Sequence, residues 1–325
     1  TSEITDELMY NLHANFKSQG AGSVTKYNFA PDYFAHIEKL IDFKKIKTLD
    51  KNIIFDGLYA ASIGYFDKLL EMHGIEFESL HMYHDVNFGG GMPEPKPKFL
   101  KELIKKVKST PNSVGFANDG DSDRFGVINI SILLMHLKKH KNYEGSLVKT
   151  VGASLLLNKV AEKLGVEVIE TAVGFKHVGE AMRKFNPIIG GEESGGLSIQ
   201  GHIPEKDGIL ANLLILEAMA YENKSLVELQ KDLYDFVGCK FYNDRIDRRL
   251  ENVDEIKPVL EEFKNKKSIG DFVVKNIDTK DGVKLYFDDN SSWVLVRPSG
   301  TEPLLRIYFE SDSVEKLEKV REELS

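Results

Sequence analysis

One pattern of residues occurs twice in this chain, and it restricts the possible folds more than any other feature. The stretches YFDKLLEMHGIEFESL (65–80) and LLNKVAEKLGVEVIET (156–171) share the spacing K-x-x-E-x-x-G-[IV]-E, 91 residues apart. Each copy lies between two apolar runs, which predicts a strand, a turn, a helix that ends at a glycine, and a second strand. Chance similarity is the alternative, but the shared glycine stop and the shared flanking strands favour a true repeat. The sequence therefore predicts two similar α/β domains in tandem.

The last third of the chain has a different period. Residues 268–300 alternate polar and apolar side chains, with turn signals at 280–282 and 288–292, which predicts an antiparallel meander. Residues 313–324 are spaced as an amphipathic helix. The charged stretch DRIDRRLENVDEIKP (244–258) is expected to lead into this unit and to present a solvated face. A third, α+β unit is therefore predicted to begin near residue 240.

One junction departs from ordinary connections. In FGVINISILLMHLKKH a strand at 125–130 is predicted to run directly into a helix at about 131–140, without turn residues between them. Ser131 could cap the helix, or a segment is missing at this point.

Composition excludes several classes of protein. The 325 residues allow two or three domains, and a net charge of −8 argues against general nucleic-acid or membrane-surface binding. The single cysteine, Cys239, cannot form an internal disulfide, which fits a reducing, cytoplasmic setting. The longest apolar-rich stretch, residues 209–221, contains Asn212 and Glu217 and is too short to span a bilayer.

FANDGDSDRFG (116–126) places Asp119, Asp121 and Asp123 at alternate positions, so an extended segment would point all three carboxylates one way. Without a cation they would repel one another, and all-oxygen ligands favour Mg²⁺, Mn²⁺ or Ca²⁺ over zinc. An EF-hand is excluded, because Arg124 and Ile130 stand where glycine and glutamate are needed. A solvated Asp-rich turn remains the alternative. Beside a metal, Arg124 would face an anion such as a phosphoryl group.

A second polar site is predicted in VRPSGTEPLLRIYF (296–309). The turn after the strand can direct backbone N–H groups and two hydroxyls inward, and Arg297 and Arg306 could clamp phosphate oxygens. A hairpin turn with two exposed arginines is the alternative.

A third site is indicated in IIGGEESGGLSIQGHIPEKDGI (188–209). Glu192 and Ser194 lie among glycines, and a carboxylate next to a hydroxyl suits paired sugar hydroxyls. Alone, the pattern also fits a Gly-rich surface loop. Lys176 and His177 follow a predicted strand end, where α/β sheets bind ligands, although a solvated tip would look the same.

Taken together, DGDSDR, GFKH, GEESGG, HIPEKDGI and RPSGTEPLLRIY occur in the order and at the domain-sized spacing of the α-D-phosphohexomutase family, which the whole chain resembles. The resemblance implies an α/β fold of tandem α/β/α sandwich domains with mixed sheets, followed by a C-terminal α+β domain with an antiparallel sheet and helices. The expected domains are residues 1–28 (the remnant of a first domain), 29–145, 146–239 and 240–325.

The resemblance also implies roles for particular residues. Arg124 and Lys176 are expected to be catalytic, and Mg²⁺ is expected at Asp119, Asp121 and Asp123. The expected substrate-binding residues are Glu192, Ser194, His177 and Lys206 for the sugar, and Arg297, Ser299, Gly300, Thr301 and Arg306 for the phosphate that is not transferred.

The family's reaction passes a phosphoryl group from an enzyme phosphoserine to a hexose phosphate, through a bisphosphate such as glucose 1,6-bisphosphate. The resemblance favours glucose over mannose, and amino sugars less. No Thr-Ala-Ser-His-Asn-Pro-like serine loop occurs here: Ser2 lacks these neighbours, and Ser62 falls in the next domain. The 325 residues alone are therefore expected not to turn over. A phosphomannomutase, a non-catalytic phosphosugar-binding fragment and a metal-dependent phosphatase remain alternatives. The oligomeric state is not predicted.

Overall fold

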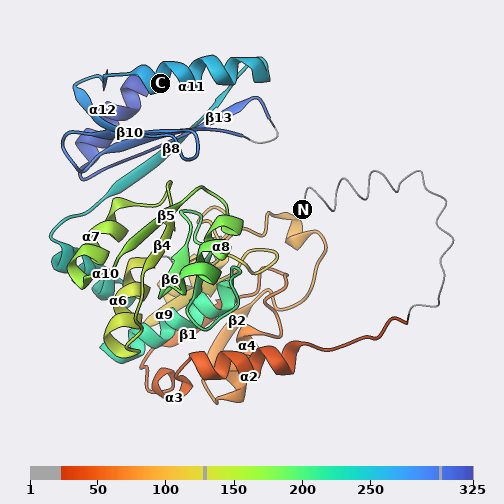
Figure 1. The fold of residues 1–325 in the computed structure, drawn as a ribbon. Helices are drawn as coiled ribbons and strands as arrows, with labels where there is room; N and C mark the ends of the chain where they lie inside the picture. Colours follow the sequence, from red (N-terminus) through yellow and green to blue (C-terminus); the bar gives the residue numbers. More distant parts are fainter. Residues whose placement is uncertain (1–22, 127–129, 300–301, 325) are drawn as a thin grey trace.

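The computed structural model describes residues 23–126, 130–299 and 302–324, which form three separate sheets with helices packed around them (Figure 1). In the first sheet, β1 (Asn52–Asp56) lies between β2 (Phe77–Leu80) and β3 (Ser113–Ala117), and all three strands are parallel. The helical elements of this part are α2 (Ala30–Leu40), α3 (Phe43–Ile46), α4 (Phe66–Met72), η1 (Phe88–Gly90) and α5 (Lys101–Ser109).

The second sheet has the order β5-β4-β6-β7. Its central strand β4 (Leu147–Thr150) is parallel to β5 (Val168–Thr171) and β6 (Ile189–Gly191), while β7 (Leu197–Ile199) runs antiparallel to β6. The helices of this part are α6 (Ile130–His140), α7 (Leu155–Leu164), α8 (Phe175–Phe185), α9 (Gly208–Glu222) and α10 (Leu226–Val237).

The repeated pattern folds as predicted in both copies. The first copy gives β1, α4 and β2, and the second gives β4, α7 and β5, each with a parallel strand pair. Gly165 (φ +65°) directly follows α7, and Gly74 (φ +61°) follows α4 after His73; both lie in the left-handed region, where glycine avoids the steric cost of a side chain. The prediction of two similar α/β units is confirmed.

The third sheet is antiparallel, with the order β8-β13-β12-β11-β10-β9. The predicted meander is confirmed by β10 (Phe272–Asp278), β11 (Val283–Phe287) and β12 (Trp293–Pro298), and the predicted helix by α12 (Val314–Leu324). The remaining elements are β8 (Tyr242–Arg249), η2 (Val253–Glu255), α11 (Ile256–Asn265), β9 (Ser268–Ile269) and β13 (Leu304–Ser311).

The charged stretch after residue 240 was predicted to lead into the C-terminal unit, and its first part is itself a strand of that unit, β8. Residues of β8 pair along their whole length with β13 and are alternately exposed and half-buried. An edge strand with one face in solvent accommodates charged side chains, which explains why its composition concealed it.

The junction near residue 130 differs from its prediction. Phe125 forms one antiparallel bridge with Asn118, and Ile130 already begins α6, so no strand reaches residue 130. Ser131 is the second residue of α6, so it lies inside the helix and not before it. The alternative of a missing segment near Ile130–Ser131 stays a prediction, and residues 127–129 lie outside the described part of the chain.

One hydrophobic core extends through the first two sheets, and the third sheet has its own. The helix α9 joins the first two parts because it is buried on every side and contacts α3, α6, α10 and β7. It has 15 residues, and within the described residues no helix is long and apolar enough to cross a membrane. The domain bounds given above remain predictions.

Candidate functional site

The three aspartates follow the carboxyl end of β3, on residues 118–125, here called the metal loop. One carboxylate oxygen from each of Asp119, Asp121 and Asp123 lies within 4.8 Å of the others. The loop is not extended: Ser122 has φ +64°, its N–H donates to Asp119 O at 3.0 Å, and the ends close through the Asn118–Phe125 bridge. The predicted convergence is present, but a tight turn produces it.

Arg124 is held against two of these carboxylates. Its backbone N–H donates to Asp119 Oδ1 at 2.8 Å and its Nε to Asp119 Oδ2, while Asp123 Oδ1 lies 3.4 Å from the same Nε. Asp119 is 1% exposed, and this burial raises its pKa against the opposing effect of Arg124. Carboxylate repulsion is thus only partly neutralised by the chain itself.

The donor set fits a magnesium ion. All the converging groups are carboxylate oxygens, the ligands that Mg²⁺ prefers. Asp123 Oδ1 is buried without a hydrogen-bond partner in the described residues, which leaves it available as a ligand, and Asp121 is exposed.

The predicted loop that carries Glu192 and Ser194 covers residues 192–196 between β6 and β7, and is here called the sugar loop. Glu192 N–H donates to Gly196 O at 3.0 Å, and Ser194 Oγ donates to Glu192 Oε2 at 3.2 Å, so the carboxylate and hydroxyl lie side by side as predicted. Burial, followed by the nearby Glu193 carboxylate, raises the pKa of Glu192. Sequence reasoning missed the role of Glu193, whose Oε2 accepts from Thr150 Oγ1 at 2.8 Å and so ties the loop to the end of β4.

Lys206 connects the two loops. Its Nζ forms an ion pair with Asp123, and its aliphatic stem passes so close to Gly196 that a side chain there would overlap it. Burial lowers the pKa of Lys206, but the contact with Asp123 and the nearby Glu192 carboxylate together outweigh burial, so the pKa is raised overall. The side chain of Lys206 therefore brings together the motifs DGDSDR, GEESGG and HIPEKDGI.

The sugar loop also faces a cleft of about 590 Å³ between the second and third sheets. Its walls include residues of the sugar loop, the start of α7 and strands β8, β12 and β13; among them are Glu192, Glu193, Ser194, Ser154, Arg245, Trp293, Tyr308 and Glu310.

Arg297 and Arg306, here called the phosphate clamp, are directly opposite each other on β12 and β13. Like charges in this arrangement are unfavourable unless an anion lies between them. Arg297 Nε donates to Asp281 Oδ2 at 2.7 Å, whereas no ion pair involves Arg306 within the described ranges. Ser299 N–H donates to Leu304 O at 2.7 Å; the predicted Gly300 and Thr301 lie outside the described residues.

Lys176 and His177 occupy the first turn of α8, directly after β5, as predicted. Lys176 is exposed and His177 half-buried. Asp281 links this turn to the phosphate clamp, because it accepts both Val173 N–H at 2.9 Å and Arg297 Nε. The structure thus forms two groups, one around the metal and sugar loops and one around the clamp, with no contact between Lys176 and the metal loop in the part of the chain described.

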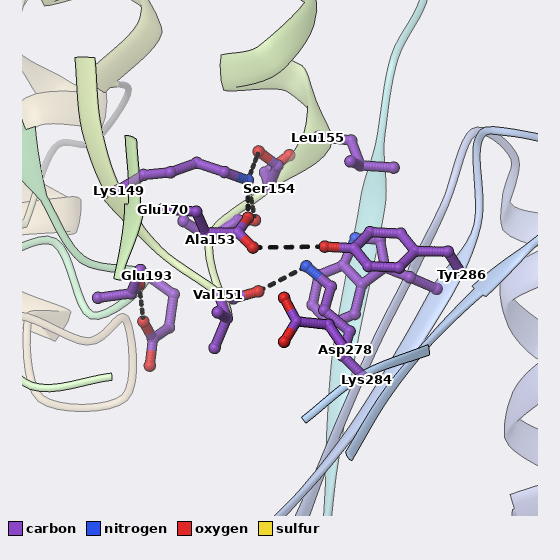
Figure 2. A network of polar contacts seen from close by, with 12 residues as sticks. Lys149, Val151, Ala153, Ser154, Leu155, Glu170, Glu193, Asp278, Lys284 and Tyr286 are labelled. Atoms are coloured by element: carbon purple, nitrogen blue, oxygen red, sulfur yellow. Dashed lines mark hydrogen bonds and ion pairs between the residues drawn. The ribbon is translucent and has the colours of Figure 1, made fainter. Parts of the chain in front are cut away.

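A polar network, here called the interface network, joins the second and third sheets. Figure 2 labels four of its members, Lys149, Glu170, Lys284 and Tyr286. The buried Trp293 and Glu310 complete it, with Trp293 Nε1 donating to Glu310 Oε1 at 2.9 Å. Lys284 Nζ donates to Val151 O and lies 4.2 Å from the centre of the Trp293 ring. Lys149 Nζ donates to Ala153 O at 3.0 Å. These residues fix the third sheet above the strand ends of the second.

A substitution of Gly208 would test how closely α9 packs under the metal loop. A Cβ at this position would lie 2.5 Å from Asn118 Nδ2, 2.6 Å from Arg124 O and 2.8 Å from Ser122 O. Gly208→Ala is expected to destabilise the protein by about 1–3 kcal/mol and to weaken Mn²⁺ binding, because the loop backbone must move. Urea unfolding and Mn²⁺ titration measure the two effects. Gly91→Ala is the matched control, since its Cβ would meet only Phe88 O at 3.6 Å; equal losses in both variants would contradict the prediction.

Comparison with known proteins gives a consistent result over most of the chain. Three family models match: phosphoglucomutase/phosphomannomutase α/β/α domain II over residues 31–130, α/β/α domain III over 121–236, and the C-terminal domain over 245–325. A probable phosphoglucosamine mutase of Methanopyrus kandleri is 31% identical, and the match covers 89% of this chain and 64% of that protein. A phosphoglucomutase/phosphomannomutase of Thermococcus kodakarensis is 31% identical, with 96% and 68% covered.

A solved structure, a putative phosphomannomutase from Thermus thermophilus, superposes with a TM-score of 0.78 at 31% identity. The match covers 93% of this chain and 66% of that one. The chain therefore spans about two thirds of the length of the relatives named here.

Proposed function

The chain belongs to the phosphoglucomutase/phosphomannomutase family of α-D-phosphohexomutases, and from this premise we propose that it binds a hexose phosphate and Mg²⁺ for phosphoryl transfer between C1 and C6 of the sugar. One observation carries the proposal. Lys206 joins the metal loop to the sugar loop, while a separate pair of opposed arginines, of which only Arg297 has a carboxylate partner in the described residues, could bind an anion. A substrate with phosphates at both ends of a sugar needs two such places.

Each group of residues has a distinct part in this proposal. Asp119, Asp121 and Asp123 would hold Mg²⁺, which when bound neutralises charge on the transferring phosphoryl group. Arg124, already oriented by Asp119, would contribute further positive charge beside it. The phosphate clamp would bind the phosphate that is not transferred.

The sugar would be bound by Glu192 and Ser194, with Lys206 and His177 as further contacts and Lys176 entering from α8. Adjacent equatorial hydroxyls can bond to a carboxylate and hydroxyl in either orientation, as a mutase that turns its bisphosphate over requires. Burial of the Glu192 carboxylate makes these hydrogen bonds stronger than they would be in water.

We propose glucose phosphates as the substrate, with glucosamine phosphates as the second candidate. The second is supported by relatives named phosphoglucosamine mutase and by the acidic sugar loop, where Glu192 and Glu193 would suit an ammonium at C2. With this support, amino sugars rank higher among the candidate substrates than they did from the sequence motifs alone. Turnover rates with glucose, mannose and glucosamine 1-phosphates, compared at equal concentration after a serine-bearing first domain has been added, rank the three.

The phosphoserine is proposed to come from a segment that this sequence does not contain. Ser62, the serine in the first turn of the first sheet, is fully buried, so it cannot reach a substrate. We expect no conversion of glucose 1-phosphate to glucose 6-phosphate by the 325-residue chain with Mg²⁺ and trace glucose 1,6-bisphosphate. Adding the serine-bearing first domain of a relative as a separate protein should restore turnover. Turnover by the chain alone would overturn the missing-serine proposal, and release of inorganic phosphate would support the phosphatase alternative.

Binding tests the phosphate clamp without turnover. Arg306→Gln is expected to weaken glucose 1,6-bisphosphate binding by about 10–100-fold, because a charge-assisted hydrogen bond contributes about 1.5–3 kcal/mol. Titration calorimetry measures the change. Arg183→Gln, which removes an exposed arginine at the far end of α8, serves as the control. Unchanged affinity in Arg306→Gln would remove the clamp from the proposal.

A further inference from the structure

A single buried amide stands out in α9. Asn212 is fully buried in a helix whose residues from Gly208 to Ala220 are all buried and mostly apolar. Burying an amide is unfavourable by about 1–3 kcal/mol unless its groups are hydrogen-bonded. Asn212 Nδ2 donates to Asn118 Oδ1 at 3.0 Å, and Asn212 Oδ1 has no hydrogen-bond partner in the described part of the chain. The one directed contact of this amide is therefore with the metal loop.

Asn118, which accepts the hydrogen bond from Asn212, is itself hydrogen-bonded to the backbone of the metal loop. It is fully buried, immediately precedes Asp119, and donates from Nδ2 to Arg124 O at 3.1 Å. The first turn of α9 supplies a second support, because Gly208 N–H donates to Ser122 O at 3.0 Å. The helix α9 thus holds Ser122 O directly through Gly208, and Asn212 supports Arg124 O through Asn118.

These hydrogen bonds oppose the loop opening that repulsion between the three carboxylates would favour. Three carboxylates within 4.8 Å repel one another when no divalent cation is present, which favours an open loop. Hydrogen bonds inside the core are not exchanged for water, so the amide pair resists that opening.

We propose that Asn212 and Asn118 are positioning residues that hold the metal loop in its binding geometry before the divalent cation arrives. The inference rests on the proposed function, because it assigns these residues a purpose only if the three aspartates bind a metal. Removing groups that orient metal ligands commonly weakens metal affinity about 10–100-fold.

A matched control is available in the same helix. Glu217 is also fully buried in α9, where it accepts from Asp42 N–H at 2.7 Å, Lys141 Nζ at 2.7 Å and His136 Nε2 at 2.8 Å. None of these partners belongs to the metal loop. Glu217→Gln therefore perturbs a buried polar group of α9 without touching the loop.

The experiment is Mn²⁺ binding to the 325-residue chain, measured by the electron paramagnetic resonance signal of free Mn²⁺, with folding checked by circular dichroism. Asn212→Leu, and the smaller Asn212→Ala in case leucine does not fit, are expected to weaken Mn²⁺ affinity about tenfold while the chain stays folded. Glu217→Gln should lower thermal stability and leave Mn²⁺ affinity unchanged.

Unchanged Mn²⁺ affinity in a folded Asn212 variant, or an equal loss in Glu217→Gln, would overturn this inference alone. A wild-type chain that binds Mn²⁺ no better than Asp121→Asn would overturn the proposed metal site, and the inference with it.

Discussion

Replacing Asp123 by asparagine is expected to weaken Mn²⁺ or Mg²⁺ binding by at least about 100-fold. Asp123 Oδ1 is buried without a hydrogen-bond partner in the described residues, and the other oxygen of this carboxylate pairs with Lys206. Losing one partner of a close charge pair typically reduces binding by about 2–5 kcal/mol, and here Lys206 is also left without its carboxylate. Metal titration followed by electron paramagnetic resonance gives the affinity directly.

The same substitution should also separate the two loops. Without the Asp123 carboxylate, Lys206 no longer connects the metal loop to the sugar loop, so hexose phosphate binding should weaken even when no metal is added. Asp50→Asn makes the identical chemical change at an exposed position between α3 and β1 and serves as the control. A fall of less than tenfold in metal affinity in Asp123→Asn would contradict the assignment of this carboxylate as a ligand.

The stability of the C-terminal unit is expected to rise between pH 7 and pH 9 because of the interface network. Burial, with a further contribution from Lys149, lowers the pKa of Lys284 from 10.5 to about 7. Between these two values the unfolded chain binds a proton that the folded chain lacks, so raising the pH favours the folded state. One such group contributes up to about 1.4 kcal/mol per pH unit, and below pH 7 its contribution to the slope vanishes.

The measurement can use the only tryptophan in the chain. Trp293 is buried against Lys284, so its fluorescence during urea unfolding reports on the third sheet. Lys284→Met should make the rise from pH 7 to pH 9 smaller, and should not abolish it, because burial also lowers the pKa of Lys149. The groups that face Lys284 are Lys149 on β4, Glu170 on β5, Asp278 on β10 and Glu310 on β13.

Lys275→Met on the exposed side of β10 is the control for loss of a lysine from the same sheet. If Lys284→Met kept the full wild-type rise, another group would have to be responsible for it.

Sequence patterns predicted the features of the fold and the site that depend on the spacing of residues close together in the chain. The repeat gave two sheet units, the alternation gave the meander, and the Asp and Glu-x-Ser spacings gave groups that do converge. Lys149 and Lys284 show where such patterns fail. In VKLYF the alternation places Lys284 on the polar face of its strand, and Lys149 is the one charged residue of LVKT, yet both are buried, because the third sheet packs over the second. No local pattern reports that packing.

The contacts of α9 were equally hidden. A helix that is apolar on every side indicates burial but not its neighbours, so neither the Asn212–Asn118 hydrogen bond nor the position of Gly208 under the metal loop could be predicted. Asp281 was missed for a similar reason: it reads as an ordinary turn residue, and only the tertiary structure brings it to Arg297 and Val173.

The shared core around α9 has a consequence for how this chain can be divided and recombined. Helices from both sides of the first unit boundary contribute to one apolar interior, so a cut near residue 146 would expose the buried faces of α3, α6 and α9 together. The C-terminal sheet keeps a separate interior and meets the second unit through a small apolar cluster around Trp293 and Leu295 and through hydrogen bonds. Gene rearrangements should therefore inherit the first two units as one module, while the last can be exchanged between relatives as an independent part.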